Sequence, residues 1–372
     1  MSTTVSSPSP APVSPQSNNS NARTRSEMAR KQRYLPTWFN FAAGAVAIGF
    51  AATFFVFGQK EPDYVGAGII AALVFLIIAG IAGYVVEGRR YGNDRFATNV
   101  IIGAFVMAVI PLVSLLYTVI VNGWARLTEG GYFTATTFGS SDPSTIVGAG
   151  HAIVGTLLIT GVTALISIPL GVLTAVYLVE YGRGPFAKVI TFLVDVMTGI
   201  PSIVAGLFAA AMIPMINLQL FGDTQFKSGF MGSVALVVLM TPIVVRNTEE
   251  MLRLVSKDLR EASYALGVSK AGTIVKIVLR TSLSGIVSGI VIAVARVIGE
   301  SAPLLITAGT TDVYNMNMFQ GQMLTLPVYV YNEYTKGHQV TAWAGALLLI
   351  LIVLLLNLAA RWIAKQFAPK GE

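Results

Sequence analysis

Three charged residues lie inside long apolar runs of this sequence, and their chemistry needs an explanation. Asp195, Arg296 and Glu300 stand among Val, Ile, Leu, Ala and Gly residues. A charge at the centre of a bilayer costs about 2.5 to 3.5 kcal/mol on insertion scales, so such residues are usually functional. Arg296 and Glu300 are four positions apart, which on one continuous helix brings them to the same face. We expect all three to line a solute path. A self-neutralising pair is the alternative for Arg296 and Glu300.

The expected solute is an oxyanion. The planar guanidinium of Arg296 can donate two parallel hydrogen bonds to phosphate-like oxygens in a poorly hydrated cavity. A carboxylate beside it repels fully deprotonated sulfate but accepts a hydrogen bond from hydrogen phosphate. Glu300, and with it Asp195, is therefore expected to favour phosphate over sulfate.

Asp195 and one further charged residue, Arg246, each have competing interpretations. Asp195 is soon followed by Gly-Ile-Pro-Ser at residues 199–202, a helix break of the kind tolerated where it lines a cavity. A hydrogen bond that fixes helix packing explains Asp195 equally well. Arg246 ends an apolar run, where snorkelling to headgroups explains it adequately. It remains a fourth candidate for the path.

Composition places the chain in a membrane. Hydrophobic residues make up 54% and charged residues 12% of 372 residues, against about 25% charged residues in soluble domains. The chain has no Cys, which excludes disulfides, thiolate chemistry and Cys-ligated zinc. No metal site, cofactor or nucleic-acid partner is predicted. Membrane lipid is the expected environment.

The apolar pattern predicts an all-α integral membrane protein with about eight transmembrane helices. Each run is close to the roughly 20 residues that cross a bilayer. Bends or breaks are expected at Pro169, Pro201 and Pro214. The runs are Trp38 to Phe57, Gly66 to Val86, Asn99 to Val121, Ile153 to Val179, Val189 to Ile216, Gly232 to Val245, Leu283 to Ile306 and Thr341 to Ile363.

Basic residues predict the orientation of these helices. They gather before the first run and after the second, fourth, sixth and eighth, which by the positive-inside rule places both termini in the cytoplasm. Residues 1–36 are rich in Ser, Pro, Asn and Thr, and we expect them to form a disordered cytoplasmic tail. The loops 122–150 and 307–340 then face outward.

A charged segment between two apolar runs has the pattern of a docking site. It holds Glu261, Ala262, Ser263 and Gly267, followed by Ile277 and Leu279. Such a segment cannot lie in hydrocarbon, and its helix formers with a central Gly predict two short surface helices joined at a turn. A second chain would bind this elbow.

These residues carry a resemblance to a known family. The Glu261 to Leu279 segment resembles the cytoplasmic coupling loop of ATP-binding-cassette importer permeases. Together with Arg246 to Val255 and the Ala295 to Leu305 segment around Arg296, it is similar to the PstA permease family. The resemblance runs from Phe96 to the C-terminus. It departs from the general loop pattern at Ser263, which replaces Ala, and at Arg280, which replaces Pro.

The resemblance implies a fold and a domain organisation. A six-helix type I importer permease core would occupy residues 96–366, with a coupling loop at 249–282. Residues 37–95 would add two extra N-terminal transmembrane helices of open role. In the family the arginine of the Arg296 segment is needed for phosphate passage, and Glu300 matches the acid of that motif.

The resemblance also implies partners and a location. The chain would assemble with a PstC-like permease, a PstB-like ATPase dimer and a PstS-like phosphate-binding protein in a bacterial inner membrane. The sequence has no G-x-x-x-x-G-K-[ST] loop, since Thr273 stands where the Lys is required after Gly267 and Gly272. We therefore expect a transport subunit rather than an enzyme, with ATP hydrolysed by another chain.

Three alternatives stay open. A proton-coupled secondary anion transporter would also use intramembrane charges, but it has no need for the charged elbow. The permease of an importer for another oxyanion would share every feature above. An intramembrane enzyme would need a second intramembrane Asp or a buried base, whereas His151 and His338 lie at predicted membrane edges.

Overall fold

The computed structural model describes residues 35–36, 38–55, 64–139, 147–222 and 227–367. Every secondary-structure element within these ranges is a helix, as the sequence predicts. Most of the predicted tail, residues 1–34, lies outside the described residues. The chain divides into two compact units, residues 1–115 and 116–372. The predicted domain boundaries after residues 36, 95 and 366 stay predictions.

The first unit contains α2 (Phe39–Phe55) and most of α3 (Tyr64–Leu127). The helix α3 is interrupted at Gly88, whose φ of +81° is one that glycine adopts without strain. The segments on either side of Gly88 lie against each other, because a Cβ added to Gly92 would come within 3.0 Å of the Tyr84 Cα. The predicted second and third apolar runs are thus the two arms of α3. Small residues permit this close approach.

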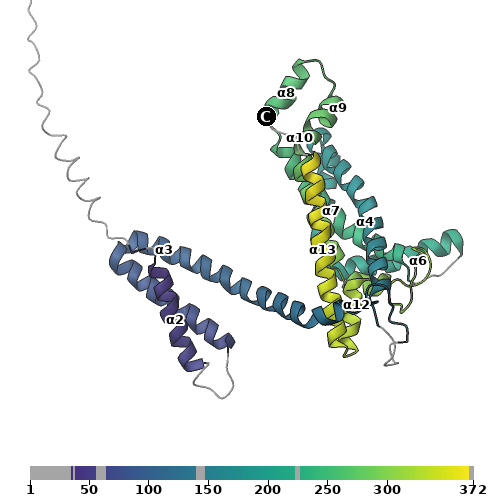
Figure 1. The fold of residues 1–372 in the computed structure, drawn as a ribbon. Helices are drawn as coiled ribbons and strands as arrows, with labels where there is room; N and C mark the ends of the chain where they lie inside the picture. The colour runs from purple at the N-terminus through teal and green to yellow at the C-terminus, as the bar shows by residue number, and fades with distance from the viewer. Residues whose placement is uncertain (1–34, 37, 56–63, 140–146, 223–226, 368–372) are drawn as a thin grey trace, which may run out of the picture. The chain divides into compact units, whose positions relative to one another are not determined.

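The second unit is a bundle of long helices with shorter helices at both ends (Figure 1). Its elements follow in chain order: α4 (Gly150–Val176), η1 (Tyr177–Tyr181), α5 (Pro185–Thr198), α6 (Ser202–Phe221), α7 (Gly229–Leu254), α8 (Lys257–Ala265), α9 (Lys270–Thr273), η2 (Ile274–Val278), α10 (Leu279–Ile298), α11 (Ala302–Thr307), α12 (Leu326–Thr335) and α13 (Gln339–Phe367).

The helices α4 and α7 form the centre of this bundle. Hydroxyl groups join them: Ser233 Oγ donates to the Ile159 carbonyl at 3.2 Å, and Thr241 Oγ1 donates to Ser167 Oγ at 3.3 Å. Such interhelical hydrogen bonds stabilise helix packing in a membrane, because the hydrophobic effect does not drive helices together in lipid. The predicted sixth run, the shortest in the sequence, belongs to α7, which is the most buried of the described spanning helices.

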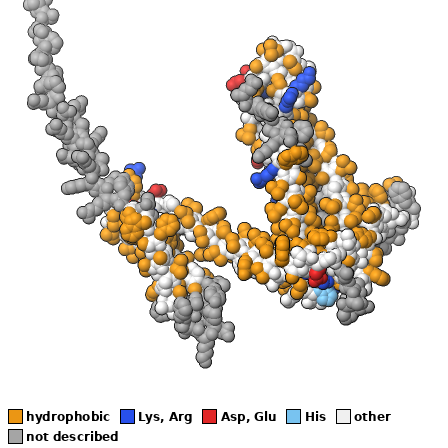
Figure 2. Space-filling view, in the orientation of Figure 1, with side chains coloured by type: hydrophobic (Ala, Val, Ile, Leu, Met, Phe, Trp, Pro, Cys, Tyr) orange, Lys and Arg blue, Asp and Glu red, His pale blue; other side chains and the backbone are white. Residues whose placement is uncertain are grey.

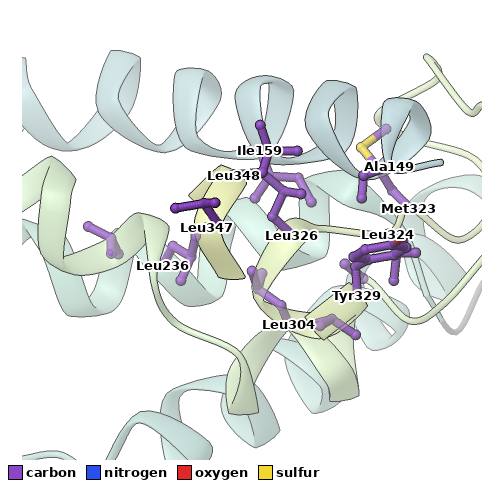
Figure 3. Close-up of a cluster of buried hydrophobic side chains, with 14 of the residues drawn as sticks. Ala149, Ile159, Leu236, Leu304, Met323, Leu324, Leu326, Tyr329, Leu347 and Leu348 are labelled. Atoms are coloured by element: carbon purple, nitrogen blue, oxygen red, sulfur yellow. The ribbon is translucent and has the colours of Figure 1, made fainter. Parts of the chain in front are cut away.

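A hydrophobic core joins α4 and α7 to the last helices of the chain (Figure 3). Leu326 and Tyr329 of α12 pack with Leu347 and Leu348 of α13 in this cluster. The backbone N–H of Leu326 donates to Thr156 Oγ1 of α4 at 2.8 Å, which fixes the start of α12. The core therefore holds the helix pair α12 and α13 against the centre of the bundle.

Six described helices are long and apolar enough to cross a membrane, and α2 is a shorter apolar helix. The predicted number of eight is therefore not confirmed, partly because α3 counts as one helix. The helices α4 and α6 continue across Pro169 and Pro214. Only the break near Pro201 separates two elements, because α5 ends at Thr198 and α6 begins at Ser202.

The second unit has two distinct ends (Figure 1). One carries α8 and α9, which form the predicted elbow. The described parts of the loops 122–150 and 307–340 meet at the other end, where Thr137 Oγ1 donates to Asp312 Oδ1 at 2.6 Å and the Tyr314 hydroxyl donates to the Thr134 carbonyl at 2.7 Å. The prediction that these two loops share one side is confirmed.

Candidate functional site

A cavity of about 250 Å³ lies between α5, α6, α7 and α10. It contains both residues of the predicted Arg296 motif, and the rest of its lining is apolar except for two hydroxyl side chains. The lining residues are Met197, Thr198, Ile200, Pro201, Ser202, Leu239, Pro242, Ile243, Arg296, Val297 and Glu300. The helix break near Pro201 is thus part of the cavity wall, as the sequence predicts.

The structure corrects the expected position of Glu300. The helix α10 ends at Ile298 with Gly299 as its C-cap, so Glu300 lies beyond the helix and not one turn above Arg296 on the same face. Both side chains still line the cavity. Among the ion pairs of the described residues, none joins Arg296 to Glu300. A self-neutralising pair therefore does not explain them.

Arg296 is available for a ligand. Its side chain is exposed to the cavity and makes no hydrogen bond or ion pair within the part of the chain that the structure describes. A guanidinium that folding leaves unpaired keeps its donors free for charge-assisted hydrogen bonds to an anion. The arrangement suits a small oxyanion.

The start of α6 adds a second source of positive potential. Pro201 is its N-cap without a side-chain hydrogen bond, and the first backbone N–H groups of α6 follow at Ser202. Such groups and the helix dipole favour an anion at a helix N-terminus. Because Pro201 and Ser202 line the cavity with Arg296, both features act on the same space.

Asp195 and Arg246 do not line this cavity, but they contact each other. Arg246 donates to an Asp195 oxygen and, at 2.8 Å, to Glu249, which also accepts from Arg253 at 2.5 Å. This chain of ion pairs begins one helical turn from the cavity, since α5 contributes Thr198 and α7 contributes Pro242 to its lining. Arg246 thus has acidic partners on both α5 and α7.

The elbow turns at glycine as predicted, but only its first helix is short, because α9 continues without a break through η2 into α10 and is the start of a spanning helix. Ser256 caps α8, Ser269 caps α9, and Gly267 between them has a φ of +75°. Glu261 and Ala262 are exposed on α8, whereas Ile277 and Leu279 are half-buried beyond α9. A charged and accessible outer face is what a docking surface requires.

Ser263 explains one departure from the general loop pattern. Its hydroxyl is buried and lies 2.8 Å from the hydroxyl of Thr273 on α9. A buried hydroxyl needs such a partner to offset its desolvation. An Ala at this position would leave Thr273 without that bond. The Ser therefore joins the two arms of the elbow.

Comparison with known proteins places the chain in a family. The family model described as "Binding-protein-dependent transport system inner membrane component" matches residues 167–370. The chain belongs to this family. Within it, the phosphate transport system permease protein PstA 1 of Mycobacterium tuberculosis H37Rv is 46% identical over 279 residues, which are 74% of this chain and 88% of that protein. The PstA protein of Haemophilus influenzae is 40% identical over 268 residues, 71% and 89% of the two chains. The resemblance to PstA-type permeases is confirmed.

Solved structures of other members of the importer class share the fold. One chain of a bacterial alginate ABC transporter, crystallised in complex with an alginate pentasaccharide-bound periplasmic protein, matches with a TM-score of 0.55 and 14% identity. The match covers 76% of this chain and 100% of that chain. The all-helical type I permease fold is therefore confirmed, and this chain is a multi-pass membrane protein.

In this family member the elbow is anchored through a residue that sequence reasoning missed. Arg260 donates to Glu180 Oε1 from Nε at 3.1 Å and from Nη2 at 2.8 Å, and it also donates to the Leu252 carbonyl at 2.9 Å. Both side chains are mostly buried. Glu180 lies in the π-helical turn η1 at the end of α4. The contact joins α8 to the end of a central helix, α4.

Proposed function

We propose that this chain is a permease subunit of an ATP-driven importer of inorganic phosphate. The observation that carries the proposal is the unpaired Arg296 in the cavity beside the α6 N-terminus. An anion bound there accepts charge-assisted hydrogen bonds from a planar donor that is always protonated. The names of the relatives, phosphate transport system permease proteins, support phosphate as that anion.

The energy source in this proposal is a separate ATPase. A PstB-like ATPase dimer binds the elbow through Glu261 and Ala262, a PstC-like permease completes the pathway, and a PstS-like protein delivers phosphate at the opposite end. Nucleotide hydrolysis moves the elbow as a lever and switches access to the cavity. The chain itself then needs no ATPase site. Both termini lie in the cytoplasm, on the elbow side.

Co-purification with transport measurement tests this function. The intact chain should retain a Walker-type ATPase and a second permease, and the complex in vesicles should accumulate phosphate only with ATP and the binding protein. Uptake that survives ATP loss but collapses with the proton gradient would support a secondary transporter. ATP-driven uptake of sulfate in preference to phosphate would replace phosphate by another oxyanion.

Glu300 is proposed to discriminate against anions that carry no proton. Replacing Glu300 by Gln removes repulsion of sulfate, and we expect the phosphate-to-sulfate uptake ratio to fall at least about fivefold, because unit charges 4 Å apart in a solvated site interact by about 1 kcal/mol. Competition between labelled phosphate and sulfate measures this ratio. The matched control is Glu250→Gln on the exposed side of α7. An unchanged ratio in Glu300→Gln would count against the role.

Asp195 and Arg246 are proposed to close the path on the elbow side of the cavity. Their ion pair joins α5 to α7 one turn beyond the cavity lining, so these helices must separate there for the anion to leave. The chain has no Cys, so an Asp195→Cys/Arg246→Cys pair can be joined selectively by a short cleavable thiol cross-linker. We expect uptake to fall to background and to return on cleavage.

A cross-linked Arg126→Cys/Glu129→Cys pair is the control for this experiment. These residues form an ion pair three positions apart at the end of α3, away from both the cavity and the elbow. Cross-linking them should leave uptake unchanged. Normal uptake by the cross-linked Asp195→Cys/Arg246→Cys protein would show that α5 and α7 need not separate at this point.

A further inference from the structure

A second cavity, of about 410 Å³, lies at the elbow end of the second unit and is strongly basic. It lies between η1, the loop after η1, the end of α7 and the elbow helices, and it shares no lining residue with the Arg296 cavity. Lys and Arg side chains are visible at this end in Figure 2. The lining residues are Val179, Glu180, Arg183, Arg253, Val255, Lys257, Arg260, Tyr264 and Lys270.

The charges of this cavity are unbalanced. Five basic side chains face a single acid, Glu180, which is already bound by Arg260 through two hydrogen bonds. Lys270 Nζ donates to the Glu180 carbonyl at 2.5 Å and lies 4.4 Å from the centre of the Tyr181 ring. Neither contact neutralises the charge of Lys270. The space therefore carries a net positive potential.

Two of the basic residues have no partner at all among the described residues. Arg183 and Lys257 are exposed to solvent, and neither makes a hydrogen bond or ion pair there. Arg253, by contrast, is paired with Glu249. The positive-inside rule accounts for many basic residues at this end of the bundle. It does not account for their convergence on one cavity, because mutual repulsion favours spreading them apart.

We infer that this cavity binds a phosphate group. The guanidinium of Arg183 offers a planar fork for two phosphate oxygens, and the ammonium of Lys257 supplies a point charge beside it. The volume exceeds that of several water molecules, about 30 Å³ each, so it holds a tetrahedral anion with room for a substituent. The backbone around the site is fixed by the Arg260 contacts to Glu180 and Leu252.

Two sources supply this chemistry at this place. The cavity lies at the end of the membrane-spanning helices, where the phosphate of an anionic lipid headgroup is present in the adjacent leaflet. Free inorganic phosphate is the other source, and it would bind outside the Arg296 cavity. The inference goes beyond the transport pathway, because no residue of this site lies in that pathway.

The experiment compares two double variants of the full-length chain. Arg183→Gln/Lys257→Gln removes the unpaired bases of the cavity. Lys188→Gln/Arg361→Gln removes one Lys and one Arg that are exposed and line neither cavity, so the net charge changes equally. All proteins carry Arg296→Gln as background. A loss of binding in this background then reports only on the basic cavity at the elbow end. The proposed transport function is tested by the separate uptake experiments.

One arm measures free phosphate and the other measures lipid. In neutral phosphatidylcholine nanodiscs, equilibrium binding of radiolabelled inorganic phosphate is determined. In detergent, native mass spectrometry counts retained phosphatidic acid. We expect the cavity variant to bind at least about tenfold more weakly than the control in one arm, since each lost bond to a charged group contributes about 1.5 to 3 kcal/mol. The arm that responds identifies the source.

Three results would overturn the inference. Equal binding by the cavity variant and the control in both arms would show that these bases only contribute to general surface charge. Absence of binding to the Arg296→Gln background chain in both arms would show that no phosphate group enters. A loss of the same size in the control variant would assign the effect to net charge and not to this cavity.

Discussion

Replacing Arg296 by Gln should reduce phosphate uptake by roughly 10- to 100-fold, because bonds to a charged group contribute about 1.5 to 3 kcal/mol. The structure gives the reason for so large an effect. The Arg296 side chain has no hydrogen-bond or ion-pair partner within the described residues, so its donors are free for the anion. The other charged side chain that lines its cavity is an acid, which cannot replace it. A Gln retains hydrogen-bonding capacity but loses the charge and the planar fork.

The matched measurements separate a binding defect from a folding defect. Arg361→Gln removes an exposed arginine near the end of α13 and should transport phosphate normally. Arg296→Lys keeps the charge without the fork and should fall between the two. Membrane insertion and binding-protein-stimulated ATP hydrolysis should persist in Arg296→Gln, because the elbow is untouched. Full uptake by Arg296→Gln would exclude Arg296 as a phosphate ligand.

The expectations that succeeded rest on local rules. Three local patterns each indicate one structural feature. A charge in an apolar run indicates a cavity or path, a Pro after Gly-Ile indicates a helix break, and a Gly between polar helix formers indicates a turn. They correctly predict a cavity with Arg296 beside the Pro201 break and an elbow that turns at Gly267. The residues that share the Arg296 cavity from α7, such as Pro242, carry no charge and gave no such signal.

The expectations that failed depended on where helices end. Spacing alone predicts Glu300 on the helix of Arg296, whereas Gly299 is the C-cap of α10 and Pro303 lies in the first turn of α11. A Gly followed within a few residues by a Pro is a sequence signal for the end of a helix, and it outweighs the four-residue spacing here. The contact of Arg260 with Glu180 was not predictable, because the two residues are 80 positions apart and a charged pair has no sequence period.

Replacing Glu261 by Arg should cause the second large loss of phosphate uptake. It should break coupling to the ATPase and spare anion binding, whereas Arg296→Gln should do the reverse. Glu261 is exposed on α8 and makes no ion pair within the described part of the chain, so Glu261→Arg breaks nothing inside the permease. Any loss must therefore arise at the surface of a partner. We expect uptake to fall at least about tenfold, because like charges placed across an interface cost several kcal/mol.

The comparison with Asp94→Arg decides whether the elbow itself is responsible. Asp94 is also exposed and its side chain is unpaired among the described residues, but it lies on α3 in the first unit, outside the predicted coupling loop. Its reversal should leave uptake near normal. In Glu261→Arg, phosphate should still protect cysteines placed in the Arg296 cavity, while ATP hydrolysis no longer responds to the binding protein. Normal uptake by Glu261→Arg would exclude Glu261 as a docking residue, because the elbow would then tolerate an opposite charge at this exposed acid. The two variants together test the proposed roles, in which Arg296 holds the anion and Glu261 connects the anion-binding helices to the energy source.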